Sequence, residues 1–149
     1  MTSYKIIDNF LPIEQFTKLQ DKLLSKNFPW FYNDFVTSEK VKESNFYFTH
    51  LFYQQYHINS EYYDLVKPIV DILKPEAIIR IKANLYLQTK EIVYHDKHVD
   101  YFCEHDGAIF YVNNNNGKTI LEDDTEIESV ANRLLTFNSG KPHNSTSSL

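Results

Sequence analysis

The stretch Ala77-Ile-Ile-Arg-Ile-Lys-Ala-Asn-Leu-Tyr-Leu-Gln88 decides the fold class, because apolar and polar side chains alternate along it. Apolar side chains occupy every second position, namely Ile79, Ile81, Ala83, Leu85 and Leu87. Successive side chains of a β-strand point to opposite faces. This period of two therefore predicts a strand with one buried face.

Short strands also follow this stretch. Residues 108–112, 118–121 and 133–137 are apolar or alternating runs separated by turn-forming residues. Between the first two lies Asn113-Asn-Asn-Asn-Gly117. Asn and Gly tolerate positive φ, so this tract predicts a hairpin turn that joins two neighbouring strands.

Two helices are expected before these strands. Apolar side chains recur at helical spacing over residues 13–24 and again over residues 63–73, where Ser60 is a candidate cap. Two helices followed by at least four strands predict a mainly β fold, with the helices packed on an antiparallel sandwich or barrel.

The composition fits a single globular domain over residues 1–149. Hydrophobic residues make up 42% of the chain, and eleven Tyr and eleven Phe against three Gly favour a sheet-rich core. The net charge is −5, so no overall basic field draws the protein to nucleic acid or to a membrane surface. We expect neither as a partner.

The cellular compartment is indicated by what the sequence lacks. Cys103 is the single cysteine and cannot form an internal disulfide, which fits a reducing compartment. The first residues do not resemble a signal peptide, and no run approaches the roughly 20 apolar residues of a membrane-spanning helix. The sequence therefore predicts a cytoplasmic protein.

The most informative motif for function is His98-Val99-Asp100. In an extended segment these two outer side chains point to the same face, where an imidazole and a carboxylate can share one metal. A second imidazole from a neighbouring strand would complete a set of two histidines and one carboxylate, which suits non-haem Fe(II). His143 follows a predicted strand and is the natural candidate.

Two interpretations that involve no metal compete with the iron site. His98 and Asp100 can form an ordinary hydrogen bond on a surface strand, and His143 can be a solvated loop residue. A zinc site built from His95, His98 and His105 is the other metal hypothesis. It lacks the cysteine pairs of structural zinc sites and the His-Glu-x-x-His pattern of zinc hydrolases, so we rank it below iron.

The order of strand, His-x-Asp, strand, glycine turn, strand and final histidine over residues 79–143 resembles the 2-oxoglutarate and Fe(II)-dependent dioxygenases. It is most similar to their small prolyl-4-hydroxylase-like members in microbes and phages. The resemblance implies a double-stranded β-helix, a jelly-roll or cupin-like sandwich braced by two or more helices. It places the iron ligands on His98, Asp100 and His143, and residues that face the cosubstrate on Asn84, Tyr86 and Tyr111.

The implied reaction uses Fe(II), 2-oxoglutarate and O2. The resemblance implies hydroxylation of a peptidyl, prolyl-like residue or of a small molecule, coupled to conversion of 2-oxoglutarate to succinate and CO2. Residues 33–56 and 101–106 are expected to form the rim of the site. The rival from another class is a jelly-roll binding module that has lost turnover, because a fold alone does not establish a function.

One feature departs from the family pattern. Relatives carry a basic residue on the strand after the last histidine, where it pairs with the far carboxylate of 2-oxoglutarate. Here six residues follow His143 and none is basic, so we expect the last C-terminal strand to be lacking. Arg80 and Lys82 are candidate substitutes, and weak binding of 2-oxoglutarate is expected.

Overall fold

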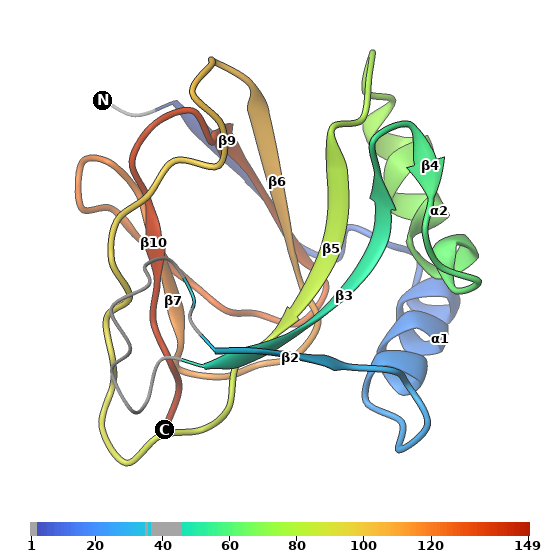
Figure 1. Cartoon of the computed structure of the whole chain (residues 1–149), viewed down its shortest axis with the longest axis horizontal. Coiled ribbons are helices and arrows are strands. Elements are labelled where there is room, and N and C mark those ends of the chain that lie inside the picture. The colour runs from blue at the N-terminus through green and yellow to red at the C-terminus, as the bar shows by residue number, and fades with distance from the viewer. Residues whose placement is uncertain (1–2, 35, 37–45) are drawn as a thin grey trace. The chain divides into compact units, whose positions relative to one another are not determined.

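The computed structural model describes residues 3–34, 36 and 46–149, which form two helices and ten strands (Figure 1). The chain divides into two compact units. Unit 1 contains Tyr86–Leu149 together with the first strand, and unit 2 contains Leu11–Asn33 and Tyr47–Leu85. Each unit draws on separate parts of the chain, and the single domain over residues 1–149 stays a prediction.

The first sheet of unit 1 has the order β1-β9-β6 and is antiparallel. Its strands are β1 (Tyr4–Ile7), β9 (Arg133–Asn138) and β6 (Asp106–Tyr111). Strand β9 lies in the middle of this sheet, and its side chains Leu134, Leu135 and Phe137 are buried.

The second sheet of unit 1 has the order β10-β7-β8, with β7 (Lys118–Ile120), β8 (Glu126–Glu128) and β10 (Asn144–Ser145). On the other edge of β10, an extended segment adds two antiparallel bridges, Tyr94 to Thr146 and His98 to His143. The segment that carries His98 is thereby placed against the chain that carries His143.

An apolar core joins the two sheets of unit 1. Its members come from β6, β9, β8 and the residue that follows β7: Tyr111, Leu135, Phe137, Ile127 and Leu121. Burying an aliphatic or aromatic side chain of this size stabilises a fold by roughly 1.5–3 kcal/mol. A mainly β chain with two antiparallel sheets and a shared core is consistent with a jelly-roll-like fold.

The predicted hairpin at residues 113–117 is wrong. Strand β6 pairs with β9, whereas β7 pairs with β8 and β10, so the asparagine tract crosses from one sheet to the other. None of these five residues has a positive φ. Side-chain bonds fix the crossover instead, because Asn114 Oδ1 accepts from the Ala131 amide and Asn115 Oδ1 accepts from the Gly117 amide.

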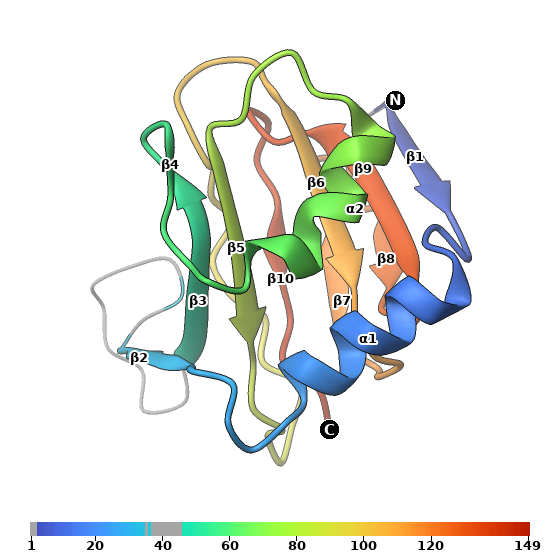
Figure 2. The ribbon, with the colours of Figure 1, turned by 90° about the vertical axis from the view of Figure 1, so that its right-hand side faces the viewer.

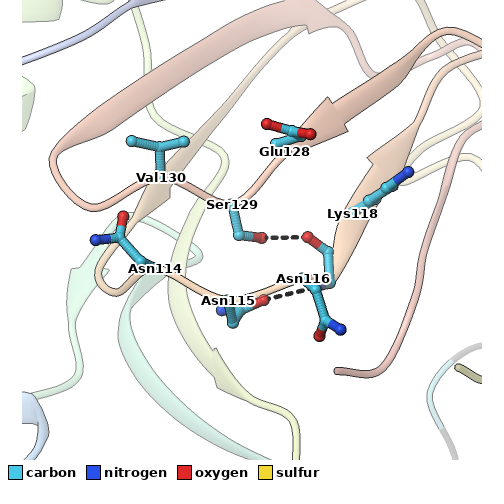
Figure 3. Close-up of a pocket in the computed structure, with 8 residues that line it drawn as sticks. Asn114, Asn115, Asn116, Lys118, Glu128, Ser129 and Val130 are labelled. Carbon is cyan, nitrogen blue, oxygen red and sulfur yellow. Dashed lines mark hydrogen bonds between the residues drawn. The ribbon is translucent and has the colours of Figure 1, made fainter. Parts of the chain in front are cut away.

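A surface hollow of about 420 Å³ lies over this crossover (Figure 3). Two of its polar side chains bond to the backbone of Gly117. The Ser129 hydroxyl donates to the Gly117 carbonyl, and Asn115 Oδ1 accepts from the Gly117 amide. We interpret these residues as structural, because their hydrogen bonds close the crossover upon itself.

Unit 2 has a four-stranded antiparallel sheet around β3 (Tyr47–Gln54). Strands β2 (Phe31–Asn33) and β4 (His57–Ile58) pair with the two ends of β3, and β5 (Arg80–Leu85) pairs along its length. The alternating stretch at residues 77–88 thus forms a strand that is shorter than its pattern. Ile79 and Leu87 lie beyond its ends and are exposed.

The helices of unit 2 are α1 (Ile13–Leu23) and α2 (Tyr63–Leu73), and they contact each other. Both lie on the same side of the β3–β5 sheet (Figures 1 and 2). Helix α1 buries Phe16, Leu19 and Leu23, which follow the helical spacing of the sequence. Neither helix in the described part of the chain is long and apolar enough to cross a membrane.

Candidate metal centre

Backbone pairing sets two imidazoles side by side. His98 and His143 form an antiparallel bridge in which each amide donates to the other residue's carbonyl, at 2.9 and 3.0 Å. Side chains of directly paired residues lie on the same face of a sheet. The two ring centroids are accordingly 4.6 Å apart.

Asp100 completes the group from two residues beyond His98. Its Oδ1 lies 3.8 Å from His98 Nε2, and its Oδ2 lies 3.9 Å from His143 Nε2. One ligand atom from each residue lies within 4.8 Å of the others, and no other such group of three occurs among residues 3–34, 36 and 46–149. The structure therefore brings the three predicted ligands together.

The exposure of the triad is uneven. The His143 side chain is 7% exposed, whereas the Asp100 side chain is 31% exposed. The His143 ring packs edge-on against Phe137 of the core, with centroids 4.9 Å apart. The centre thus has an apolar wall on one side and access from solvent on the other.

Hydrogen bonds determine which ring nitrogen faces the carboxylate. His143 Nδ1 lies 2.9 Å from the Lys141 carbonyl, and a carbonyl can only accept. Nδ1 therefore donates to this carbonyl, and Nε2 is the ring nitrogen that faces Asp100. His98 Nδ1 faces the Asp96 carbonyl in the same manner, at a longer 3.4 Å.

A divalent cation placed between the two Nε2 atoms and the Asp100 carboxylate would accept electron pairs from all three groups. Histidines that bind metals commonly donate the other ring N–H to a backbone carbonyl in this way. Two imidazole nitrogens and one carboxylate with open positions suit Fe(II), and imidazole and carboxylate ligands also accept other divalent ions. The donor set fits the implied metal.

A serine ties the loop after Asp100 to the turn before His143. The Ser139 hydroxyl bonds to His105 Nε2 at 2.7 Å, and His105 Nδ1 donates to the Cys103 carbonyl at 2.8 Å. The Asp100 amide in turn donates to the Ser139 carbonyl. Sequence reasoning missed this contact, because nothing in the spacing links positions 105 and 139.

Gly140 allows the same turn to approach the loop closely. A Cβ atom at this position would lie 2.4 Å from the Cys103 carbonyl oxygen, which is a backbone atom that cannot move aside. The close approach therefore depends on glycine, and it supports the contact between Ser139 and His105.

The zinc hypothesis is wrong, because the structure does not bring His95, His98 and His105 together as a ligand group. The His95 ring is buried and stacks on Tyr86, with centroids 5.2 Å apart, and its Nδ1 bonds to Ser145 Oγ at 2.8 Å. Burial lowers the pKa of His95, so its imidazole is held neutral.

The three residues expected to face a cosubstrate lie in different surroundings. Tyr111 is buried, its hydroxyl donates to Thr119 Oγ1 at 2.8 Å, and burial raises its pKa to about 12. Tyr86 contacts His95, as described above. Asn84 is exposed on β5 of unit 2. Their roles toward a cosubstrate stay predictions.

Two expectations concerned the ends of the site. The short strand β10 begins directly after His143, and the expected lack of the last C-terminal strand of the family pattern stays a prediction. No basic side chain follows His143 in the sequence. Of the expected rim at 33–56, residues 35 and 37–45 lie outside the described residues, and the loop 101–106 contains the fully exposed Phe102.

The chain is similar in structure to a prolyl-4-hydroxylase. This neighbour comes from Pseudomonas putida, and the two structures align with a TM-score of 0.62 over 99% of this chain and 87% of that chain. Sequence identity is 16%, so the likeness shows the fold alone. No family model and no curated protein sequence matches the chain.

Proposed function

We propose that the protein is an Fe(II)- and 2-oxoglutarate-dependent dioxygenase that hydroxylates a peptidyl, prolyl-like residue or a small molecule. The observation that carries the proposal is the convergence of two Nε2 atoms and one carboxylate within 4.8 Å. The similarity in fold to a prolyl-4-hydroxylase supports it.

The residues of the centre have distinct tasks in this proposal. Bound iron, with 2-oxoglutarate and O2, supplies the oxidising power for hydroxylation of a C–H bond. His98 and His143 present ring nitrogens as ligands, and Asp100 contributes the negative charge that favours a divalent cation. The Lys141 carbonyl orients the His143 ring, and Phe137 shields one side of it from water.

The loop that follows Asp100 is the expected rim of the site in this proposal. Phe102 lies two residues beyond this ligand and is fully exposed. In this proposal Phe102 offers an apolar contact at the rim of the site to a peptidyl or small-molecule substrate. A phosphate backbone would favour basic side chains there instead.

Turnover of the cosubstrate tests the proposal. We expect the purified chain to convert 2-oxoglutarate to succinate only when Fe(II) and O2 are present, and Asp100→Ala to abolish the conversion. His57→Ala, an exposed histidine of β4 in unit 2, is the matched control and should keep it. Metal binding without any turnover would favour the binding module that has lost catalysis.

A further inference from the structure

Unit 2 contains a serine–histidine pair that has no part in the metal centre. Ser60 Oγ lies 2.6 Å from His50 Nε2, and on the other side of the ring His50 Nδ1 lies 2.7 Å from the Pro29 carbonyl. Because a carbonyl can only accept, Nδ1 donates to it. In the neutral imidazole Nε2 then accepts the hydrogen of the Ser60 hydroxyl. The three groups form a chain of hydroxyl, imidazole and carbonyl.

The hairpin of β3 and β4 brings the serine to the histidine. His50 belongs to β3, and Ser60 lies two residues beyond the end of β4. The Asn59 amide donates to the Phe52 carbonyl at 2.8 Å, which continues the pairing with β3 by one residue. Ser60 therefore leaves the hairpin next to the part of β3 that holds His50.

Aromatic rings hold the imidazole in place. The ring centroids of Phe28 and Phe52 lie 4.5 and 4.7 Å from that of His50, and His50 is 5% exposed. The ring is thus packed by two aromatic neighbours and bonded at both nitrogens. This fixes its orientation, with Nε2 directed at the serine.

The Ser60 oxygen keeps one lone pair for a further bond. Its hydrogen is directed at His50, and the Tyr62 amide donates to the oxygen at 3.0 Å. A hydroxyl oxygen has two lone pairs, so one of them remains. The bond from Tyr62 is enough to stabilise the turn before α2, and the histidine is an additional partner. A hydroxyl beside a base that a third group orients is the arrangement of nucleophilic catalysis.

A surface hollow of about 380 Å³ gives access to the pair, because both residues line it. Pockets for small molecules begin at roughly 300 Å³. Pro29, Phe31 and Leu51 provide apolar parts of the lining, and Glu61 adds a carboxylate. Since like charges repel, this lining favours a small uncharged ligand over an anionic one.

We propose that Ser60 is a nucleophile that cleaves small, uncharged carboxylic esters with His50 as its base. Oγ bonds to the ester carbonyl carbon while His50 Nε2 takes the hydroxyl proton. The bond from that carbon to the alcohol oxygen breaks, and His50 passes the proton to this oxygen. Water then attacks the acylated serine with the same base, which releases the carboxylic acid and restores the hydroxyl. Ester and water become acid and alcohol, and the reaction is independent of the dioxygenase proposed above.

An alkyl fluorophosphonate tests the proposal on the wild-type chain in the presence of a metal chelator. This probe transfers its phosphonyl group to an activated serine oxygen, and fluoride leaves. Peptide mass spectrometry should find the adduct on Ser60 and not on Ser25, whose hydroxyl donates to the Lys22 carbonyl. Concentrated urea should prevent the labelling, because the pair forms only in the folded chain. No adduct on Ser60, or equal labelling of both serines, would overturn the proposal.

Cleavage of p-nitrophenyl acetate measures turnover at the same site. Ser60→Ala should reduce the rate to background, and His50→Gln should slow it roughly a hundredfold, the lower end of what a general base contributes. Ser25→Ala is the matched control and should keep the wild-type rate. Circular dichroism checks that each variant is folded. A wild-type rate in folded Ser60→Ala or in folded His50→Gln would overturn the proposal and leave the assignment of the metal centre standing.

Discussion

Four histidines of unit 1 fall into two pairs that differ in what faces their ring nitrogens. His98 and His143 direct Nε2 toward the carboxylate of Asp100. His95 and His105 each have a ring nitrogen bonded to a serine hydroxyl. A hydroxyl can both donate and accept a hydrogen bond, so it can pair with either tautomer of a histidine. An ionised carboxylate can only accept one.

Strand register produces this difference. His98 lies opposite His143, and His95 lies opposite Ser145, although both histidines belong to the same short segment. The side chain across the sheet therefore differs between the two histidines: an imidazole lies opposite His98, and a hydroxyl lies opposite His95. Cross-strand pairing thus assigns the roles that spacing along the chain leaves open.

The largest expected effect comes from exchanging members of the two pairs for alanine. His98→Ala and His143→Ala should abolish Mn(II) binding, because each removes one of three ligands. His105→Ala should keep the affinity within about tenfold, since it removes one neutral hydrogen bond. Anaerobic calorimetric titration of each variant measures the difference, with His57→Ala as the control. Equal loss in all four would show that the pairs do not differ.

A smaller effect is expected where His105 meets Ser139. Ser139→Ala removes the hydroxyl that ties the loop of Asp100 to the turn before His143, and should weaken Mn(II) binding by roughly fivefold. The double variant with His105→Ala should lose nothing further, because both changes break one contact. Ser129→Ala, which breaks a hydroxyl bond in the crossover, is the control. Losses of Mn(II) affinity that add up in the double variant would show that Ser139 and His105 act independently.

The smallest effect is a pH dependence of stability that belongs to His95. Burial lowers its pKa below the 6.5 of an unperturbed histidine, so near and below that pH the unfolded chain binds more protons than the folded one. Its contribution to the free energy of unfolding is full above pH 6.5 and is lost as the pH falls through the lowered pKa.

Urea unfolding of the metal-free protein at pH values between about 5 and 8 measures this contribution. His95→Phe keeps an aromatic ring beside Tyr86 but cannot titrate. Its stability should therefore fall less steeply with decreasing pH than that of the wild type. Parallel pH profiles would show that His95 is as easily protonated in the folded protein as in the unfolded chain.

Local patterns predicted the strands well where they were strong. The apolar runs at residues 108–112 and 133–137 overlap β6 and β9, because burial against a core demands such runs. Local patterns do not predict which strands pair with each other in a sheet. The tract at residues 113–117 carries residues typical of a hairpin, yet composition does not encode whether the next strand joins the same sheet.

The candidate site was likewise predicted only in part. The sequence singled out His98, Asp100 and His143, which the structure brings together. It did not predict the serine partners of His95 and His105, because the bonds to Ser145 and Ser139 join positions 50 and 34 residues apart. Such contacts depend on register, which one sequence without relatives leaves undetermined.

Thermal melting with and without Mn(II) tests most directly whether the triad is a metal centre. A ligand at a hundred times its dissociation constant stabilises the folded state by about 2.7 kcal/mol, which in a chain of this length raises Tm by roughly 5–10 °C. We predict this shift for the wild type and none for Asp100→Asn, which keeps the shape of the carboxylate and loses its charge. An equal shift in both proteins, or none in either, would contradict the assignment of His98, Asp100 and His143 as a metal site.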